Sequence, residues 1–230
     1  MRNLLRLLVC CIVIFIFSGC EIDHNEETYP YYKFESEDDT LLIKYNYIPN
    51  QIITYKNQFN KKLNFRVISN ITEKRGSYSR GTFSGGGGLL VNYYDSKIIR
   101  LEIIENPSNT SNSGDYSKVN YVFSKNKSVF VNGFNFPMWN ITSFYSINEL
   151  QDNVNVYLSD FNEIPKTEMS INNHVFKAVV VIDSNSDESL NNSSFGPLLQ
   201  NVNKIFYDYD FGIVQFNDVD GNEWKVIYPE

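Results

Sequence analysis

The chain has 230 residues, of which 20 are basic and 27 acidic, so its formal net charge is −7 at pH 7. Nucleic acids and anionic headgroups are recognised through clustered positive charge, which this composition does not favour. We therefore expect no nucleic-acid partner and no docking on lipid headgroups by charge alone. Aromatic residues make up 15% of the chain, enough to build a hydrophobic core.

The first 20 residues have the layout of an export signal. Two arginines precede an apolar run over residues 7–17, and Ser18, Gly19 and Cys20 close the run. The run is too short to span a bilayer, which needs about 20 apolar residues. With its cysteine directly after two small residues, the segment resembles a bacterial lipoprotein signal. The resemblance implies cleavage after Gly19 and acylation of Cys20; a secretory signal without lipid is the alternative.

Removal of residues 1–19 changes the charge and the thiol content of the chain. Arg2 and Arg6 leave with the signal, so 18 basic residues remain against 27 acidic ones and the net charge becomes −9. Cys20 is then the single cysteine, which excludes an intrachain disulfide although export leads to an oxidising compartment. We expect the N-terminal lipid to anchor the protein in the outer membrane, on the periplasmic face or at the cell surface.

Residues 20–39 are acidic and interrupted by Pro30, a composition typical of a solvated tether. Acidic residues close behind a lipidated cysteine also direct some Gram-negative lipoproteins to the cell surface, and this alternative stays open. Residues 40–230 show no change of composition that would mark a domain boundary. We expect them to form a single β domain.

Most of the remaining sequence has the pattern of strands. Apolar and polar residues alternate over residues 63–67 and again over residues 99–103, which predicts two strands that each bury one face. Two further β-favouring runs, 119–123 and 128–131, predict a hairpin that turns across residues 124–127.

One later run and one short helix complete the expected elements. Residues 174–182 are apolar at nearly every position, which predicts a central strand covered on both sides. Helical patterning is nearly absent. The best candidate is residues 195–203, where Pro197 near the start suits a helix of one or two turns.

Two hairpin motifs stand near the two ends of the expected domain. Residues 45–68 contain a strand, a polar turn at 57–60 and a second strand. Residues 204–227 lead an aromatic strand through Gly212, where we expect a bulge or bend, into a hairpin that turns at residues 218–221. The Asp-Gly pair in that turn is a strong hairpin signal, because glycine accepts the positive φ that such turns require.

The closing hairpin is expected to pack through cross-strand pairs, with Val214 and Phe216 on one face with Trp224 and Val226. Together the two motifs resemble a group of uncharacterised Gram-negative outer-membrane lipoproteins. The closing hairpin is also similar to the last strands of the half-barrel sheets of periplasmic lipoprotein carriers. The resemblance implies a curved antiparallel sheet, and by fold analogy a concave face that holds an acyl chain. It supplies no catalytic residues.

Few residues suggest chemistry. His24 falls in the expected tether, and His174 opens an apolar strand with no Gly-x-Ser-x-Gly motif beside it, so we interpret it as a strand-end residue rather than a base. Residues 218–223 carry clustered oxygens that suggest calcium, but their glycine spacing departs from that of a calcium loop and fits a hairpin turn. The acidic run 183–188 is interpreted in the same way, as a solvated loop.

Two other groups could bind a partner. Gly85–Gly88, with Lys74, Arg75 and Arg80 before it, lacks the Lys-Ser/Thr of a phosphate loop and is interpreted as a hairpin loop, with a polyanion or glycan site as the alternative. Aromatic residues could line a sugar-stacking or lipid-binding face, although in β domains most of them belong to the core. These are Tyr31-Tyr32, Tyr93-Tyr94 and Pro137-Met138-Trp139.

The sequence thus predicts an all-β fold: a single curved, half-barrel-like antiparallel sheet or a β-sandwich, with at most one short helix. We expect a lipid-anchored envelope protein that is not an enzyme and uses no metal or cofactor, and that binds an apolar ligand or an envelope partner. A surface module for glycan binding or adhesion is the alternative. Cys20 and Gly19 are the only residues to which the sequence assigns a role in processing or anchoring.

Overall fold

The computed structural model describes residues 29–79, 88–105, 118–127, 129–136, 156–183 and 202–229. The chain divides into two units, residues 1–30 and 31–230. Every strand reported below belongs to the second unit, and Cys20, Gly19 and His24 lie outside the described residues.

The second unit is all-β. Its strands are β1 Tyr31–Tyr32, β2 Ile52–Lys56, β3 Lys62–Tyr78, β4 Leu90–Ile103, β5 Lys118–Asn126, β6 Val129–Asn135, β7 Val156–Tyr157, β8 Thr167–Ile171, β9 His174–Asp183, β10 Val202–Asp208, β11 Gly212–Asp218 and β12 Glu223–Ile227. Helical structure in the described part of the chain is limited to two 3₁₀ turns, η2 Asp38–Thr40 and η3 Leu158–Phe161. None of the helices found there has the length and hydropathy needed to cross a membrane.

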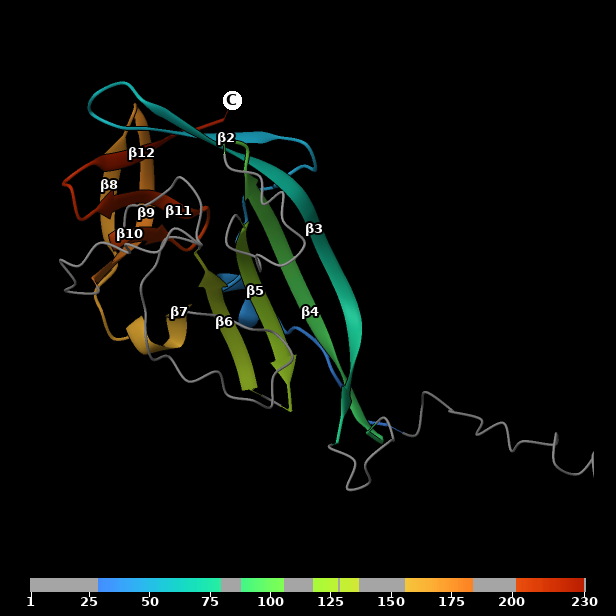
Figure 1. The fold of residues 1–230 in the computed structure, drawn as a ribbon. Coiled ribbons are helices and arrows are strands. Elements are labelled where there is room, and N and C mark those ends of the chain that lie inside the picture. The colour runs from blue at the N-terminus through green and yellow to red at the C-terminus, as the bar shows by residue number, and fades with distance from the viewer. Residues whose placement is uncertain are drawn as a thin grey trace, which may run out of the picture. The chain divides into compact units, whose positions relative to one another are not determined.

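The described strands form one curled antiparallel sheet, which confirms the first of the two expected architectures. The strand order is β7-β6-β5-β4-β3-β2-β12-β11-β10-β9-β8, and β1 pairs with β4 outside this path. Figure 1 shows the long strands β3 to β6 side by side, with β8 to β12 gathered at the other part of the sheet. The sheet therefore has the curl of a half barrel.

The two terminal motifs meet in the sheet. β2 pairs with β12, with Tyr55 opposite Val226, so the opening and closing hairpins are neighbours although about the whole domain separates them in sequence. The closing hairpin packs as expected: Phe216 lies opposite Trp224 and their rings stack, with 6.0 Å between centroids. Gly212 has φ +105°, a conformation that L-residues rarely adopt, and it begins β11 at the expected bend.

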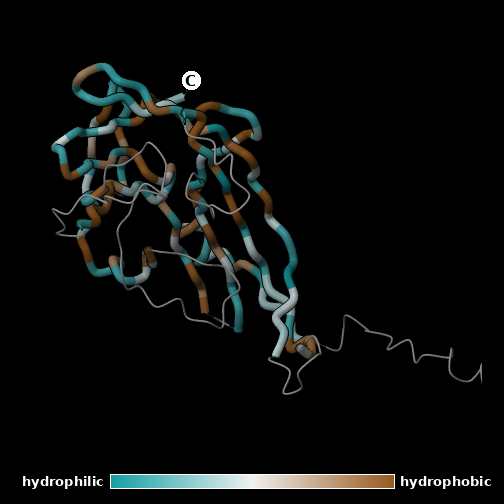
Figure 2. Tube along the Cα trace, in the orientation of Figure 1, coloured by the Kyte–Doolittle hydropathy of each residue, from teal (hydrophilic) through white to brown (hydrophobic). Residues whose placement is uncertain are grey.

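The core lies on the inner face of the curl. The alternation predicted over residues 63–67 and 99–103 is confirmed: Phe65 and Ile99, for example, are at most 1% exposed, whereas Arg66 and Arg100 are exposed. Figure 2 shows this alternation of hydrophobic and hydrophilic positions along the strands. Each strand directs every second side chain to the same side of the sheet, so the apolar residues at alternate positions of these two strands lie together on the inner face.

Buried tyrosines connect strands across this inner face. The Tyr55 hydroxyl donates a hydrogen bond to the Ile213 carbonyl (2.6 Å), and the Tyr121 hydroxyl accepts one from the Ile213 N–H (3.1 Å). Burial raises the pKa of Tyr121 to about 12, and raises those of Tyr47, Tyr55 and Tyr207 well above the ordinary value. Phenol groups in this core are therefore held in the neutral form.

The β5–β6 hairpin forms as predicted, but its turn is tighter. Ser124, Lys125 and Asn126 belong to β5 rather than to the turn, and Asn126 pairs with Val129. Lys127 takes a positive φ of 50°, which matches the mirror-image turns that join hairpin strands through two residues. The polar composition of 124–127 suggested a longer turn, whereas the side chains of Lys125 and Asn126 have hydrogen-bond partners on the folded unit and that of Ser124 is buried.

Two other expectations are corrected. β9 is not covered on both sides, because Val175 and Val181 on its outer face are 42% and 38% exposed. A continuous apolar run reports β propensity as well as burial, and valine favours strands even at half-exposed positions. The helix expected at residues 195–203 is wrong at its end, since Val202 and Asn203 begin β10; the rest of that span lies outside the described residues.

Candidate functional site

The first candidate site begins where β1 joins the sheet. β5 pairs with β4 only over Ser96–Glu102, which leaves the edge of β4 before Ser96 without a partner from β5. β1 occupies that edge in parallel, with Tyr31 opposite Tyr93 and Tyr32 opposite Tyr94. Two tyrosine pairs that the sequence proposed as a binding face are thus brought together.

This placement differs from the solvated tether expected over residues 20–39, because residues 31–39 pack on the sheet. Asp95 holds their first part. It accepts a hydrogen bond from the Tyr31 hydroxyl (2.5 Å) and another from the Phe34 N–H (2.9 Å). The hydrogen bond to Asp95, followed by burial and the charge of Asp95, raises the pKa of Tyr31 to about 12.

Lys125 holds the acidic part of the same segment. Its Nζ lies 2.7 Å from Glu35 Oε2 and 2.7 Å from Asp38 Oδ2, and Asp38 is only 6% exposed. The hydrogen bonds that Lys125 donates to Asp38 and then to Glu35 raise the pKa of Lys125. A carboxylate is buried here at acceptable cost because it is paired with this ammonium group and with the Glu35 N–H.

The chain then crosses the inner face of the sheet. The Leu41 and Ile43 carbonyls accept hydrogen bonds from Asn132 and Lys97, and the Lys44 N–H donates to the Asp210 carbonyl. Ile43 and Tyr47 are at most 2% exposed, and the Tyr47 hydroxyl donates to the Phe211 carbonyl (2.6 Å). Residues 31–48, which we call the N-terminal segment, therefore occupy part of the concave face that the half-barrel analogy would leave for a ligand.

A lysine lies over the joined tyrosines. Lys74 Nζ is 4.0 Å from the centroid of the Tyr93 ring and 5.0 Å from that of Tyr31, and Lys33 Nζ is 5.1 Å from that of Tyr31. These distances allow cation–π attraction, worth about 0.5–1 kcal/mol at exposed sites. We call Tyr31, Tyr93, Lys33 and Lys74 the tyrosine–lysine cluster.

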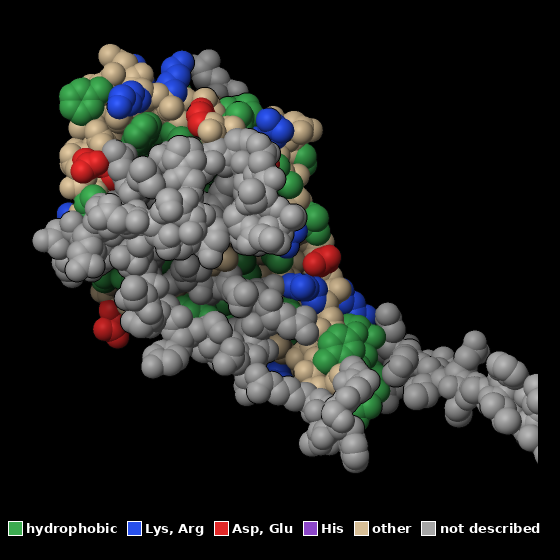
Figure 3. All heavy atoms as spheres, viewed as in Figure 1, with side chains coloured by type: hydrophobic (Ala, Val, Ile, Leu, Met, Phe, Trp, Pro, Cys, Tyr) green, Lys and Arg blue, Asp and Glu red, His purple; other side chains and the backbone are tan. Residues whose placement is uncertain are grey.

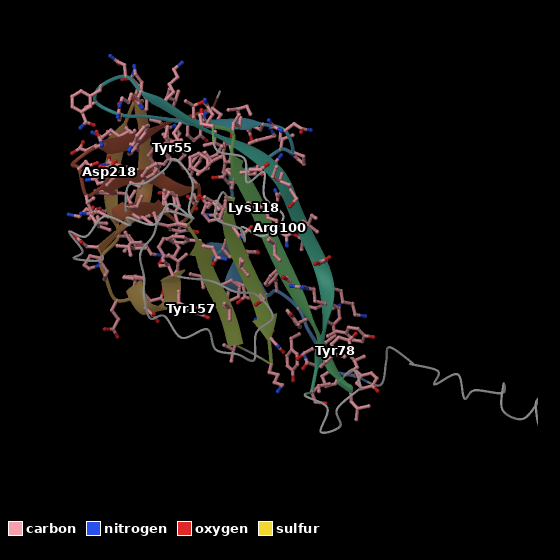
Figure 4. The ribbon with its side chains drawn as sticks, in the orientation of Figure 1. Tyr55, Tyr78, Arg100, Lys118, Tyr157 and Asp218 are labelled. Atoms are coloured by element: carbon pink, nitrogen blue, oxygen red, sulfur yellow. The ribbon has the colours of Figure 1, made fainter. Side chains whose placement is uncertain are left out.

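The cluster continues towards the outer end of the β3–β4 pair, residues 74–79 and 88–95, which we call the arm. Gly76 lies opposite Tyr93, and a Cβ at Gly76 would come within 2.9 Å of Leu90 Cδ1 and 3.0 Å of the Tyr78 ring. The absence of a side chain there lets Tyr78 and Leu90 close over the strand. Tyr78 lies at the far end of the ribbon from Tyr55 (Figure 4), and hydrophobic side chains, green in Figure 3, gather there.

Two other candidates from the sequence, His174 and Asp218, are engaged in ring stacking and in hydrogen bonds within the fold. His174 stands at the start of β9, as expected, and its ring stacks on Tyr228 with centroids 3.5 Å apart. The oxygens of Asp218 accept hydrogen bonds from the N–H groups of Asp220 and Asn222 and from the Trp224 indole, so they brace the hairpin turn. In the described ranges no group of three His, Cys, Asp or Glu side chains could hold a metal ion.

The remaining candidates lie wholly or partly outside the described residues. Arg80, Gly85–Gly87, Pro137-Met138-Trp139 and most of the acidic run 183–188 are among them. Of the basic group, Lys74 joins the tyrosines, and Arg75 Nε lies 3.6 Å from Glu73.

Sequence reasoning missed Asp95 and Lys125 as organisers of this site. Asp95 is 64 residues from Tyr31 in the chain, and Lys125 is 87 residues from Asp38. No local pattern marks such pairs, because each residue alone resembles an ordinary strand or turn position. The contact of Glu35 and Asp38 with Lys125 becomes visible only once the strands are paired.

Comparisons of this chain with protein-family models, with curated proteins and with solved structures find no match.

Proposed function

We propose that this chain is a lipid-anchored, non-catalytic binding module of the bacterial cell envelope, held at the outer membrane through Cys20. The observation that carries the proposal is the closure of a short apolar run by Ser18-Gly19-Cys20, ten residues before the first strand of a folded β unit. Stable anchoring generally takes more than one acyl chain, which lipoprotein acylation supplies.

The N-terminal segment on the inner face supports an envelope partner over an enclosed apolar ligand. An acyl chain on that face would have to displace Ile43 and Tyr47, together with the hydrogen bonds that fix the N-terminal segment. The cost would include re-exposing apolar surface at about 25 cal/mol per Å². A partner that binds outside the curl requires no such displacement.

The surroundings of His174 support a non-catalytic role for this residue. Its ring lies nearly parallel to Tyr228, with an interplanar angle of 7°, and also contacts Phe176 at 4.6 Å between centroids. A general base needs a reacting proton within hydrogen-bond reach, whereas a stacked imidazole at a strand end contributes packing.

The anchoring is tested by Cys20→Ala, with Cys11→Ala as the matched control. Cys11 lies inside the apolar run and would leave with the signal, so its substitution should preserve labelling by radioactive palmitate and membrane fractionation. Cys20→Ala should abolish the label and release the protein from the lipid anchor. Equal labelling of the two variants would contradict the proposal.

Glycan binding at the cell surface is the second candidate, favoured by the exposure of Tyr31 (38%) and Tyr78 (56%) on one face of the arm. Protease shaving of intact cells distinguishes the two settings. A surface module should be cleaved in intact cells, whereas a periplasm-facing module should be cleaved only after the outer membrane is opened.

A further inference from the structure

We propose that the arm is a second membrane contact, which lies in the interface of the bilayer that holds the lipid of Cys20. The inference rests on the proposed anchoring and goes beyond it, because it names the surface that faces the membrane and the side chains that meet it.

Large apolar side chains are exposed together at the arm. Leu89 is 79% exposed, Tyr78 is 56% exposed and Val91 is 37% exposed. Val91 is the extra residue at the register shift between Ser77 and Tyr78, a bulge that alters the direction of side chains at the end of the ribbon. Because Tyr78 pairs with Leu90, Leu89 lies on the opposite face of the ribbon, so apolar side chains are exposed on both faces at the end of the arm. Exposed apolar groups gathered in one region mark interaction surfaces, and an acyl-headgroup boundary accommodates them.

The polar groups beside them suit a headgroup region. Tyrosine is enriched at membrane interfaces because its ring is apolar and its hydroxyl polar, and lysine extends its ammonium group towards phosphates while its stem stays in apolar surroundings. Lys33 and Lys74 flank the tyrosines, and Arg75 follows. Asp95 lies on the same face as Lys74, whereas Arg75 and Glu73 lie on the opposite face of β3, so the attraction of the two lysines is local and modest.

The arm is built as a firm support for such a contact. β3 and β4 are paired along their length from Phe65–Ile103 to Tyr78–Leu90, with two shifts of register. β1 adds a third strand beside Tyr93 and Tyr94. Three paired strands are more stable than an isolated two-stranded hairpin, which is marginal in water.

The covalent connection keeps the arm within reach of the bilayer that holds the lipid. Ten residues, 21–30, connect Cys20 to β1, and a chain of that length reaches at most about 40 Å when fully extended. A lipid anchored through so short a segment raises the effective concentration of bilayer at the arm, so a contact that is weak in isolation becomes populated.

A membrane fits the arm better than a glycan does. Sugars stack on open ring faces and need hydrogen-bonding partners around them, whereas Tyr31 and Tyr93 each have a lysine ammonium over the ring. The exposed neighbours Leu89 and Val91 are aliphatic and offer a sugar no hydrogen bonds. Aliphatic side chains next to tyrosine and lysine are the composition of an interfacial contact.

The test uses the full chain, purified in its lipidated form and reconstituted into phosphatidylethanolamine–phosphatidylglycerol vesicles. On the proposed processing the mature chain has no other thiol than Cys20, so Leu89→Cys provides one site for an environment-sensitive fluorophore. Phe59→Cys is the matched control: Phe59 is 68% exposed, in the β2–β3 turn at the other end of β3. Nitroxide carried near the headgroups should remove about half of the Leu89 emission and little of the Phe59 emission.

Each outcome decides the proposal. Equal quenching at the two positions in protein that carries palmitate would overturn the membrane contact and leave the anchoring intact. Protein without palmitate would overturn both, because the contact rests on the anchor. A change in Leu89 emission caused by purified peptidoglycan fragments, with no effect of nitroxide lipid, would overturn the contact in favour of a glycan partner.

Discussion

The two ends of the β3–β4 pair share the same antiparallel ladder and differ in what lies over it. At one end Phe65 faces Ile103 and Val67 faces Leu101, and all four side chains are at most 2% exposed. At the other end Tyr78 faces Leu90, and Tyr78 is 56% exposed. Figure 4 shows how far the two ends are separated, with Tyr55 near the first and Tyr78 at the second.

The difference arises from the neighbouring strands. β2 pairs with β3 only from Lys62 to Arg66, and β5 pairs with β4 only from Ser96 to Glu102. Beyond these limits neither β2 nor β5 pairs with the ribbon, and the short strand β1 pairs with β4 instead. The curled part of the sheet no longer covers the inner face of the ribbon there. Asn92 and Tyr94 stay buried in this stretch, whereas Tyr78, Leu89 and Val91 are exposed and available for contact with a partner.

The largest expected effect is alkaline unfolding driven by the buried tyrosines of the core. Burial raises the pKa of Tyr47, Tyr55 and Tyr207 well above the ordinary value, while the same residues ionise near pH 10 in the unfolded chain. Their contribution to stability is complete below about pH 10 and is lost as the pH rises above it, at about 1.4 kcal/mol per pH unit for each tyrosine. Circular dichroism and tyrosinate absorbance should change together. Full ionisation with an unchanged sheet signal would contradict this expectation.

A matched pair of truncations compares the two ends directly. Phe65→Ala removes a ring that is 1% exposed and lies 5.2 Å from the Tyr55 ring, and it should lower the free energy of unfolding by about 3–5 kcal/mol. Tyr78→Ala at the exposed end should change it by about 0.5 kcal/mol or less. Urea denaturation measures both. A large loss from Tyr78→Ala would mean that the arm belongs to the core.

Alanine substitutions at two glycines separate the energetic cost of backbone strain from that of a steric contact. Gly212→Ala forces φ +105° on an alanine and brings its Cβ within 2.9 Å of Tyr121 Cζ, so we expect a loss of about 2–4 kcal/mol. Gly221→Ala has φ +78° with no atom within 4 Å, so only the backbone cost of about 1 kcal/mol remains. Thermal denaturation of the two variants checks the order. Equal losses would show that the contact with Tyr121 relaxes.

The smallest expected effect is a local increase in amide hydrogen exchange. Lys125→Met leaves Asp38 buried without its ammonium partner, so the N-terminal segment should exchange its amide hydrogens faster over residues 34–42. Lys44→Met, which removes the exposed ion pair with Asp210, is the control and should leave this exchange unchanged. Hydrogen-exchange mass spectrometry follows both variants. Unchanged exchange in Lys125→Met would show that Asp95 and the backbone contacts suffice to hold the segment.

Local patterns predicted the hairpins well. Asp220-Gly221 placed the closing turn, and alternation placed Phe65 and Ile99 on the inner face, because turn chemistry and the two-residue period of a strand act over a few residues. The same patterns misjudged residues 31–39 and the outer face of β9. There the outcome depends on which distant strand lies beside the segment, and composition carries no information about that.

The sequence by itself determined the all-β class, the closing hairpin and the expectation of a lipid at Cys20, since propensity, turn residues and a signal pattern are properties of adjacent residues. Only the tertiary structure decided that β1 completes the edge of β4, that Lys125 pairs with Glu35 and Asp38, and that the concave face holds the chain's own N-terminal segment. The physical reason is distance along the chain. These contacts join residues that are 62 to 164 positions apart, and their energies exist only after the sheet has curled.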